Sequence, residues 1–584
     1  MKRDLDRLAG EEFDLAIVGG GVYGACAAHE AAARGLRVAL VERGDFGSGT
    51  SSQSLKVIHG GLRYLQHLDL RRTLESIAER RRLLRMAPHL VHPLPCAMPV
   101  YGHGMRGREA LAFGLWLNEL AGSSRGGPAD PARRIPRGRL LGRDEMLALC
   151  PGLDANGLTG GALWWDAQAW STERLLLAFL ASAARDGAAL ANHVEAVELR
   201  LERAGRARRV RGLALRDAAS GRELELRARD VLVTVGPWLD GFLRRGGVAT
   251  RRPAFLPSKA LNVAVRRLFP HDTAIGLAGR APFRDRDALL RAGSRLFFLV
   301  PWRDATLVGT RHLAWDGDPD GFAVTPEDAE RFLEEARAAL PGAALTARDV
   351  LGVYGGMLPR AAGTPASGEV QLRKQHAVVD HAREPEPVEG LVSVVGVKWT
   401  AARAVAERAV SLVAARLGVG AAGRREPRLL AGAEEAPVGA LVERARSRGA
   451  AGLDGDALFA LVRAHGGEAP ALLDAIAAEP ALAERLHPGV PVVAAQIAHA
   501  VRHEMALHLD DVLLRRTDLH LARPLGRDLL ARCAAIAGPI LGWDDARRRA
   551  EIARAEAALR RFALLPEAVE ALGLAEAPPR PAAS

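Results

Sequence analysis

A glycine-rich turn near the start of the chain constrains the fold more than any other feature. Residues 13–18, FDLAIV, read as a buried strand, and GGGVYG (19–24) follows directly. The alanine-rich stretch 22–35 has the pattern of a helix, and RVALVE (37–42) reads as a second strand. A strand, a tight turn, a helix and a second strand make a βαβ unit, which places two parallel strands side by side in one sheet. The sequence therefore predicts an α/β domain at the start of the chain.

The glycines of this turn have the spacing that a dinucleotide needs. Gly19, Gly21 and Gly24 form GxGxxG, which provides a tight turn, close approach to a pyrophosphate and close helix–strand packing. The helix N-terminus adds unpaired N–H groups that face the phosphates. Glu42 ends the second strand, eighteen residues beyond Gly24, where its carboxylate can accept hydrogen bonds from ribose hydroxyls. A carboxylate at this position would repel the 2′-phosphate of NADP, so FAD or NAD is expected instead.

The position of the motif favours FAD over NAD. The remaining segments with the pattern of a nucleotide domain are dispersed along the chain. DVLVTVGPW (230–238) reads as a strand that ends in a turn at Gly236, and residues 390–410 read as a second strand–glycine–helix unit. Gly396, Lys398 and Thr400 lie at the opening of that helix. An extended FAD is contacted by several separated segments, whereas a nicotinamide enzyme usually keeps its halves contiguous.

The rest of the chain divides into further regions. A chain of 584 residues should hold two or more domains. Strand-like pieces alternate with turns between residues 193 and 310, which predicts a largely β region inserted into the first fold. Residues 416–437 are rich in Gly, Ala, Arg and Pro and read as a linker, residues 438–574 have helical patterns throughout, and residues 575–584 are expected to be disordered.

Composition narrows the classes of partner. The formal charge of +11 favours something anionic: nucleic acid, a lipid surface or a small anion. No RRM, KH or zinc-finger signature is present, so nucleic acid is not expected. Four dispersed cysteines form no CxxC pair, and no metal site is expected. Without a signal-peptide layout or a run of ~18 uncharged apolar residues, a cytoplasmic location is expected, and peripheral contact with the inner face of the cytoplasmic membrane is left open.

Four segments together carry a family resemblance. GGGVYGACAAHEAAARGLRVALVE, TSSQSLKVIHGGLRYLQH, VTVGPW and VVGVKWTAAR occur in this order, and VRHEMALHLDDVLLRRT follows in the helical region. They resemble the FAD-dependent glycerol-3-phosphate dehydrogenases of glycerol metabolism, over about residues 12–570. The resemblance implies oxidation of sn-glycerol 3-phosphate to dihydroxyacetone phosphate, with electrons passing from the flavin to a quinone, or to oxygen as in the oxidase branch. A homodimer is left open.

The resemblance also implies a three-part architecture: a Rossmann-like FAD domain of the D-amino-acid-oxidase type, a β-rich capping domain, and an all-helical C-terminal domain. The expected FAD-binding segments are about 12–105, 170–240 and 350–412, within an oxidoreductase domain of residues 1–415. The expected capping segments are about 106–169 and 241–349, followed by the linker and a C-terminal domain over 438–574.

The stretch 50–67 supplies several expected site residues. The hydroxyls of Thr50, Ser51 and Ser52 can donate to a pyrophosphate, and Lys56 is a compact charge for a phosphate or the flavin. Gly60 and Gly61 let the backbone approach a flat ring. The candidate cofactor-binding residues are Gly19, Gly21, Gly24, Glu42, Thr50, Ser51, Ser52, Lys56, Gly60, Gly61, Val194, Gly236, Gly396, Lys398 and Thr400.

A second set of residues is expected to act on the substrate. His59 is a candidate base for the proton of the C2 hydroxyl, and Arg63 is a candidate for the substrate phosphate. The candidate catalytic residues are His59, Arg63 and Lys398. The candidate substrate-binding residues are Arg63, Lys259, Asn262, Arg360 and Arg373.

Two positions depart from the pattern of the family. Leu358 stands where the family has a substrate-binding arginine, and Arg360 shares a strand face with it, so we expect Arg360 to reach the pocket instead. Asn262 stands where the family has a histidine, and a neutral amide cannot act as a base. The alternatives are therefore an FAD enzyme for another small hydroxy or amino substrate, and a flavin-binding protein whose active site has decayed.

Three other features have simpler interpretations. Trp164-Trp165-Asp166 reads as core and strand edge. In HEMALH the two histidines, His503 and His508, are five residues apart and do not share a helix face, so this is not a zinc-protease motif. The basic helix predicted over 69–86 is either a solvated face or a contact for anionic lipid.

Overall fold

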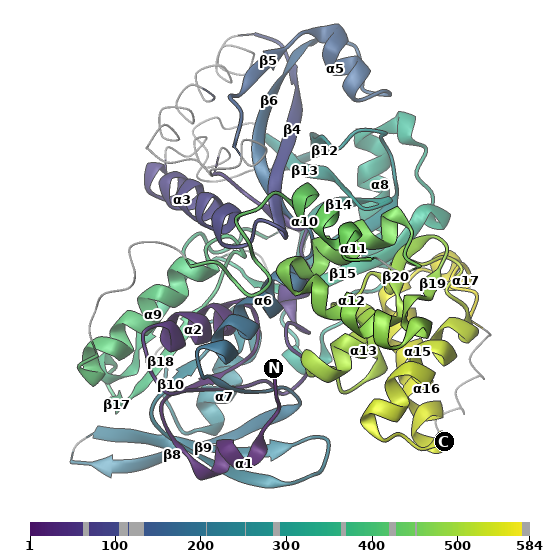
Figure 1. Cartoon of the computed structure of the whole chain (residues 1–584). Coiled ribbons are helices and arrows are strands. Elements are labelled where there is room, and N and C mark those ends of the chain that lie inside the picture. The colour runs from purple at the N-terminus through teal and green to yellow at the C-terminus, as the bar shows by residue number, and fades with distance from the viewer. Residues whose placement is uncertain are drawn as a thin grey trace, which may run out of the picture.

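The computed structural model describes residues 1–61, 69–103, 115, 134–205, 207–250, 253–283, 293–363, 370–419, 428–449 and 452–574. These residues form two large sheets and a helical C-terminal part that packs beside both (Figure 1). The predicted disordered tail lies outside the described residues.

The first sheet contains the predicted βαβ unit. Five of its strands run parallel in the order β18-β10-β1-β2-β7. Their bounds are Leu391–Val395, Glu223–Val233, Glu12–Val18, Val38–Val41 and Ala189–Ala191. Because the strands are parallel, their carboxyl ends meet at one edge, where open α/β sheets bind ligands. The remaining strands of the sheet are β8 (Val194–Ala204), β9 (Ala207–Asp217), β16 (Ala377–Asp380) and β17 (Val388–Glu389).

Helices cover one face of this sheet and a β layer covers the other. The alanine-rich α2 (Val22–Ala33) packs between α6 (Thr172–Arg185) and α9 (Ala402–Leu417), and small side chains allow this close approach. These helices share one buried core with Leu15 and Ile17 of β1. On the other face, β8, β9, α1 (Leu5–Gly10) and α7 (Leu239–Arg245) enclose a second core.

The second sheet has the order β15-β11-β14-β13-β12-β4-β6-β3, and β5 pairs with β6. The strands in that order are Val350–Pro359, Pro257–Arg266, Ala305–Ala314, Gly293–Trp302, Ala274–Phe283, Val91–Tyr101, Leu158–Ala169 and Val57–Ile58, with β5 at Arg139–Leu141. The helices beside it are α3 (Leu70–Met86), α5 (Arg143–Leu149) and α8 (Pro326–Ala339).

This sheet corrects the expected domain boundaries. Strands β4 and β15 fall within the expected FAD-binding segments 12–105 and 350–412, but both pair with strands of the expected capping segments. The reason is the pairing itself: β4 runs antiparallel along most of β6, and β15 along most of β11. Periodicity within one strand does not reveal its partner.

The C-terminal part is mainly helical, as expected. Its helices are α10 (Val438–Ser447), α11 (Gly455–His465), α12 (Ala469–Ala478), α13 (Ala494–His503), α14 (Leu509–Asp511), α15 (Gly526–Leu541), α16 (Asp545–Ala563) and α17 (Pro566–Glu570). The prediction that this part is helical throughout is wrong in one place. A short β-hairpin is formed by β19 (Arg485–His487) and β20 (Val490–Val493), with Pro488 and Gly489 in the turn between them.

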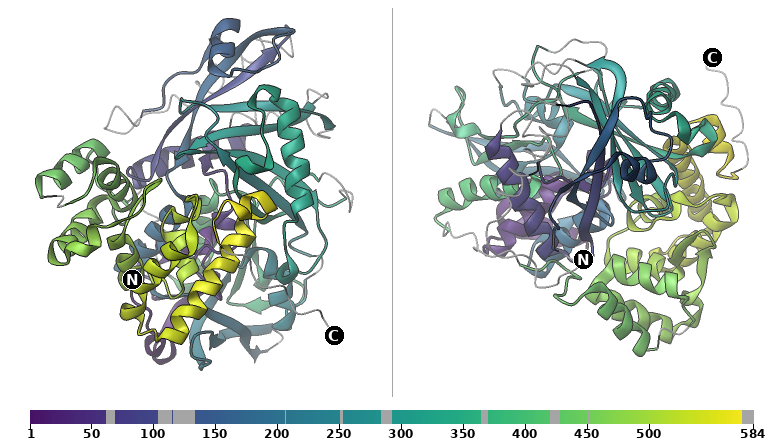
Figure 2. Two further views of the ribbon diagram at one scale, coloured as in Figure 1. Left: turned by 90° about the vertical axis from the view of Figure 1, so that its right-hand side faces the viewer. Right: turned by 90° about the horizontal axis from the view of Figure 1, so that it is seen from above.

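The C-terminal part contacts both sheets rather than standing apart. Figure 2 shows its green and yellow helices along one side of the molecule. Phe562 of α16 occupies the space over Gly352 of β15, where a Cβ would lie 2.0 Å from the ring. The contact with the first sheet includes Met505, which joins the core beneath the helices of that sheet, and a polar cluster described below. Among the described residues, none of the helices combines the length and apolar character needed to span a membrane.

Candidate functional site

The turn between β1 and α2 lies at the carboxyl edge of the parallel strands. A Cβ at Gly24 would lie 1.9 Å from the carbonyl oxygen of Gly19, so only glycine lets the helix pack against the turn. Gly19 has φ +104, and a Cβ there would lie 2.9 Å from the carbonyl oxygen of Thr234 on the neighbouring strand. These constraints leave the N-terminus of α2 open to a phosphate, as the GxGxxG spacing predicts.

Ser51 and Glu42 flank this helix N-terminus. Ser51 Oγ accepts a hydrogen bond from Val22 N–H at 2.9 Å, and its own hydroxyl hydrogen stays available to donate to a phosphate oxygen. The Glu42 carboxylate accepts from the N–H groups of Gly20 at 2.7 Å and Gly44 at 2.9 Å. Burial raises the pKa of Glu42, although these N–H groups oppose that shift. The structure thus brings together the glycine turn, a hydroxyl donor and a carboxylate acceptor.

Other predicted cofactor residues occupy the same edge of the sheet. Val194 is buried, and its N–H donates to the carbonyl oxygen of Glu42 at 2.8 Å. Gly236 follows β10 in a left-handed conformation, with φ +57 and open space where a Cβ would stand. A Cβ at Gly396 would lie 2.1 Å from the Tyr23 ring, so this glycine is required by packing. Ser52 is buried and donates to the carbonyl oxygen of Gly49 at 3.3 Å.

The segment around Lys398 is fixed by Tyr23 of α2. The phenol donates to the carbonyl oxygen of Lys398 at 2.7 Å and accepts from Lys398 N–H at 3.1 Å. Burial raises the pKa of Tyr23 to about 12, so the phenol stays neutral. Thr400, just beyond, accepts from His59 N–H through Oγ1 at 3.2 Å. The structure therefore places the predicted segments 396–400 and 59–61 in direct contact.

Two expected ligand groups are corrected by the structure. Lys56 does not face a ligand: its side chain is 1% exposed, and Nζ lies 2.8 Å from the Glu173 carboxylate. The rings of Trp302 and Tyr354 cover the ammonium at 4.8 and 5.3 Å. Thr50 Oγ1 donates to the carbonyl oxygen of Met357 and accepts from its N–H, both at 3.0 Å, so it ties the loop to β15. Glu173 and Met357 lie far away in the sequence, so the stretch 50–67 gave no sign of either partner.

His59 forms a pair that sequence reasoning missed. Its Nδ1 lies 3.3 Å from Asp166 Oδ2, and its side chain is 45% exposed. Asp166 of β6 is buried, and its Oδ1 accepts from Gly60 N–H at 2.6 Å. When Nδ1–H donates to Asp166, Nε2 is the nitrogen that can accept a proton. From the sequence, Asp166 is expected to be core and strand edge, although a carboxylate inside an apolar strand is itself a signal of a partner.

Arg80 of α3 completes this arrangement. Its Nη1 donates to the carbonyl oxygen of Trp165 at 2.6 Å and to Asp166 Oδ1 at 3.2 Å. Burial alone raises the pKa of Asp166, but His59, Arg80 and Gly60 N–H together hold that pKa below its ordinary value. A Cβ at Gly60 would lie 2.0 Å from Arg80 Nη1, so this glycine makes room for the guanidinium. The carboxylate is thus held ionised beside the imidazole.

Lys259 and Asn262 lie on β11 and Arg360 directly follows the neighbouring β15, and the structure gives all three protein partners. Lys259 Nζ pairs with Asp328 at 2.7 Å, and Arg360 pairs with Asp316. The Asn262 amide donates to the carbonyl oxygen of Gln53 at 3.1 Å. A substrate phosphate would have to compete with these partners.

The remaining substrate residues are less constrained by the structure. Arg373 Nη1 donates to the carbonyl oxygen of Ala254 at 3.1 Å. Its backbone N–H donates to the carbonyl oxygen of Pro359, which places it beside Arg360. Arg63 lies outside the described residues, and its expected role stays a prediction.

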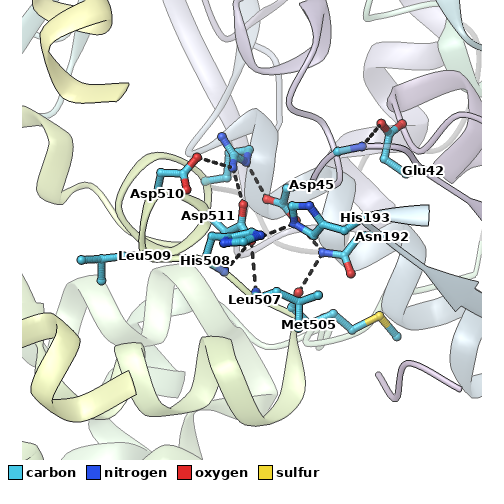
Figure 3. Close-up of polar contacts among 12 residues, drawn as sticks. Glu42, Asp45, Asn192, His193, Met505, Leu507, His508, Leu509, Asp510 and Asp511 are labelled. Atoms are coloured by element: carbon cyan, nitrogen blue, oxygen red, sulfur yellow. Dashed lines mark hydrogen bonds and ion pairs between the residues drawn. The ribbon is translucent and has the colours of Figure 1, made fainter. Parts of the chain in front are cut away.

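A buried polar cluster joins the C-terminal part to the loop after β2 (Figure 3). We call Asp45, Asn192, His193, Asp511, Arg515 and Arg516 the Asp45 cluster. Arg516 makes two contacts of 2.7 and 2.8 Å with the Asp45 carboxylate, and Arg515 Nε adds a third at 2.5 Å. Asn192 also donates to Asp45, and His193 pairs with Asp511 at 3.0 Å.

The Asp45 cluster positions the loop that follows Glu42. The acidic and histidine side chains of the cluster are close enough together to suggest a metal site, but both arginines already neutralise its carboxylates. We therefore interpret the Asp45 cluster as a structural contact and not as a metal site. Asp45 is three residues from Glu42, so the C-terminal part holds the end of β2 in place.

These residues fit a dinucleotide that contains flavin. The helix N-terminus, Ser51 and Glu42 match a pyrophosphate and a ribose. The exposed His59 ring lies beside the loop contacts to Thr400, at the junction of the two sheets. A cofactor that spans both positions must be extended, as FAD is.

Comparisons with known proteins agree with this reading. Residues 14–412 match the family model described as FAD dependent oxidoreductase, and residues 426–548 match the one described as C-terminal domain of alpha-glycerophosphate oxidase. A glycerol-3-phosphate dehydrogenase from a Synechocystis species is 32% identical over 88% of this chain and 90% of its own length. Glycerol-3-phosphate dehydrogenase 2 from Mycobacterium tuberculosis is also 32% identical, over 94% of this chain and 88% of its own.

A solved structure shows the same fold over nearly the whole chain. The glycerol-3-phosphate dehydrogenase from Bacillus halodurans, complexed with FAD, superposes with a TM-score of 0.73 over 96% of this chain and 97% of that one, at 22% identity. The expected architecture of a D-amino-acid-oxidase-type FAD domain, a β-rich substrate domain and a helical C-terminal domain is confirmed. FAD is the cofactor that the family model supports. The chain belongs to the FAD-dependent glycerol-3-phosphate dehydrogenase family.

Proposed function

We propose that this chain oxidises sn-glycerol 3-phosphate to dihydroxyacetone phosphate at the His59 site. The observation that carries the proposal is the His59–Asp166 pair at 3.3 Å, in a loop that contacts the predicted cofactor segment through Thr400. Bound FAD would supply the acceptor for the hydride of C2 of the alcohol. His59 Nε2 takes the proton of the C2 hydroxyl, and Asp166 holds the ring in the tautomer that can accept it.

We further propose that Arg63, Arg360 and Arg373, with Lys259, bind the substrate phosphate. Arginine suits this task because its planar fork matches phosphate oxygens. The names of the relatives, all glycerol-3-phosphate dehydrogenases, support a phosphorylated alcohol as the substrate. On this account, Lys259 and Arg360 each give up a carboxylate partner when they bind the phosphate. Because these ion pairs must be broken, the proposal predicts a modest affinity for the substrate.

The electron acceptor is a separate proposal. We infer a membrane quinone, reached by peripheral contact of the protein with the bilayer. Helix α3 supports this idea, since Leu74 is 51% exposed and Arg71 beside it is also exposed. Arg80 cannot contribute to such a contact, because it is buried against Asp166. Oxygen is the competing acceptor, and oxygen uptake with glycerol 3-phosphate in the absence of quinone would identify it.

Anaerobic titration of the FAD-loaded protein tests the substrate. Glycerol 3-phosphate should bleach the visible flavin absorbance, whereas glycerol, a small amino acid and a small hydroxy acid should leave it unchanged. Bleaching by the amino or hydroxy acid alone would assign the chain to another substrate class. Bound flavin that none of the four compounds reduces would contradict an intact active site.

A further inference from the structure

A large cavity lies apart from the residues assigned above to the cofactor and the substrate. Its volume is about 910 Å³, and it opens where the second sheet, the start of α6 and the C-terminal part meet. Trp302 at the end of β13 and Arg303 in the turn to β14 form one wall, and residues between 514 and 523 of the C-terminal part form another. A volume of this size matches the ~300–1,000 Å³ of typical small-molecule sites.

The walls of the cavity carry an excess of positive charge. Eight arginines line it against five carboxylates. Seven of these arginines have a carboxylate partner within 4.0 Å. Arg523 is the exception: among the described residues, no carboxylate forms an ion pair with it.

Arg523 is held by carbonyl groups alone. Its Nη1 donates to the carbonyl oxygens of Ala522 at 2.7 Å and His520 at 3.1 Å, and Nη2 donates to that of Leu351. An arginine has five N–H donors, and the buried Nε–H finds no acceptor among the described residues. Burial lowers the pKa of Arg523 to about 10, so it stays charged at neutral pH. A partly buried cation without a counter-charge is costly, and an anion would relieve that cost.

The cavity and the His59 site lie at different points along the same strand. Gln168 of β6 lines the cavity, whereas Asp166, two residues earlier, pairs with His59. The two positions share a strand face and are about 7 Å apart along the strand. Glu173 lines the cavity, and its ion-pair partner Lys56 belongs to the loop that leads to His59. Neither His59 nor Asp166 is among the described residues that line the cavity, so a ligand there would be separate from a substrate at His59.

We propose that this cavity binds a small phosphate-bearing anion, with Arg523 as its main charged contact. A phosphate group suits this cavity, because the planar guanidinium of an arginine can donate two parallel hydrogen bonds to phosphate oxygens. An aromatic ligand fits less well, since Arg303 and Arg463 already lie 3.3 and 4.7 Å from the ring of Trp170, and Lys56 lies 4.8 Å from that of Trp302. The phosphate can belong to a soluble ester or to a lipid headgroup.

Calorimetric titration of the FAD-loaded protein tests this site, with pyrophosphate as the soluble probe and vesicles of phosphatidylglycerol with phosphatidylcholine as the lipid probe. The test variant is Arg523→Gln. The matched control is Arg549→Gln, which removes an exposed arginine of α16 that does not line the cavity. Loss of a charge-assisted contact should weaken binding of one probe at least about ten-fold in Arg523→Gln and leave Arg549→Gln unchanged. The KM for glycerol 3-phosphate should stay the same in both, which separates this site from the substrate site.

The outcomes differ clearly. Arg523-dependent binding of pyrophosphate indicates a soluble phosphate, and Arg523-dependent binding of vesicles alone indicates a headgroup. If neither probe distinguishes wild type from Arg523→Gln, the proposal is wrong. Should Arg523→Gln fail to fold, Arg523→Lys replaces it, because the ammonium keeps the charge but lacks the planar fork that binds phosphate oxygens in pairs. Equal binding by Arg523→Lys and Arg549→Gln would then overturn the proposal.

Discussion

The carboxylate of Asp166 links His59 to the second sheet, with Oδ2 3.3 Å from His59 Nδ1 and Oδ1 2.6 Å from Gly60 N. One buried side chain thus orients the imidazole and fixes the backbone of the residue that follows it. Arg80 supplies the counter-charge from α3. The proton acceptor of the proposed reaction is therefore positioned by three elements, β3, β6 and α3, and not by its own loop alone.

Asp166→Asn tests this positioning role in catalysis. The amide keeps the shape but can donate to the imidazole, which favours the wrong tautomer, so kcat should fall about 10²-fold or more while KM changes little. Flavin content should stay at the wild-type level. Asp144→Asn, at a side chain that is 98% exposed, is the control. Equal kcat values in the two variants would mean that Asp166 only supports the fold.

The same substitution predicts a change in the pH dependence of stability. The pKa of Asp166 in the folded protein lies below its ordinary value of about 3.9, so its charge stabilises the fold above that pH. This contribution is lost as pH falls through the folded pKa. Denaturant unfolding should show that wild type exceeds Asp166→Asn most at neutral pH and that the difference shrinks below about pH 4. A difference that grows on acidification would reverse the assigned sign.

Lys56 is expected to act on stability and not on substrate affinity. Because its ammonium is buried against Glu173, Lys56→Met should lower the free energy of unfolding by about 3 kcal/mol or more. Glu173→Gln should cost a similar amount, and the double variant should recover part of the loss, since it leaves no unpaired buried charge. Denaturant titration of all four proteins measures this coupling. If Lys56→Met instead raised the KM for glycerol 3-phosphate and left stability unchanged, Lys56 would bind a phosphate as the sequence predicts.

The Asp45 cluster predicts that the C-terminal part supports cofactor retention. Asp45→Asn leaves Arg515 and Arg516 partly unpaired in a buried site, which should cost about 3–5 kcal/mol and loosen the loop after Glu42. The dissociation constant for FAD should rise together with the loss of stability. Asp144→Asn is again the control, because that side chain is 98% exposed and does not belong to the cluster. Tighter or unchanged FAD binding in Asp45→Asn would show that the cluster holds the two parts together without positioning Glu42.

The sequence predicted local features well and pairings between distant segments poorly. The βαβ unit, the GxGxxG turn and the β region could be foreseen because each has a period or a spacing of its own. The partners of Lys56 and Thr50 could not, since Glu173 and Met357 lie more than a hundred residues away. Asp166 was missed for the same reason: β6 brings it to His59 only through its pairing with β3.

Stopped-flow mixing of FAD-loaded protein with glycerol 3-phosphate under anaerobic conditions tests the central claim most directly. Wild type should bleach in a single fast phase. His59→Asn should bind FAD with its normal spectrum but bleach about 10²–10⁴ times more slowly, because the alcohol proton has lost its acceptor. Equal bleaching rates in the two proteins would contradict the role of His59.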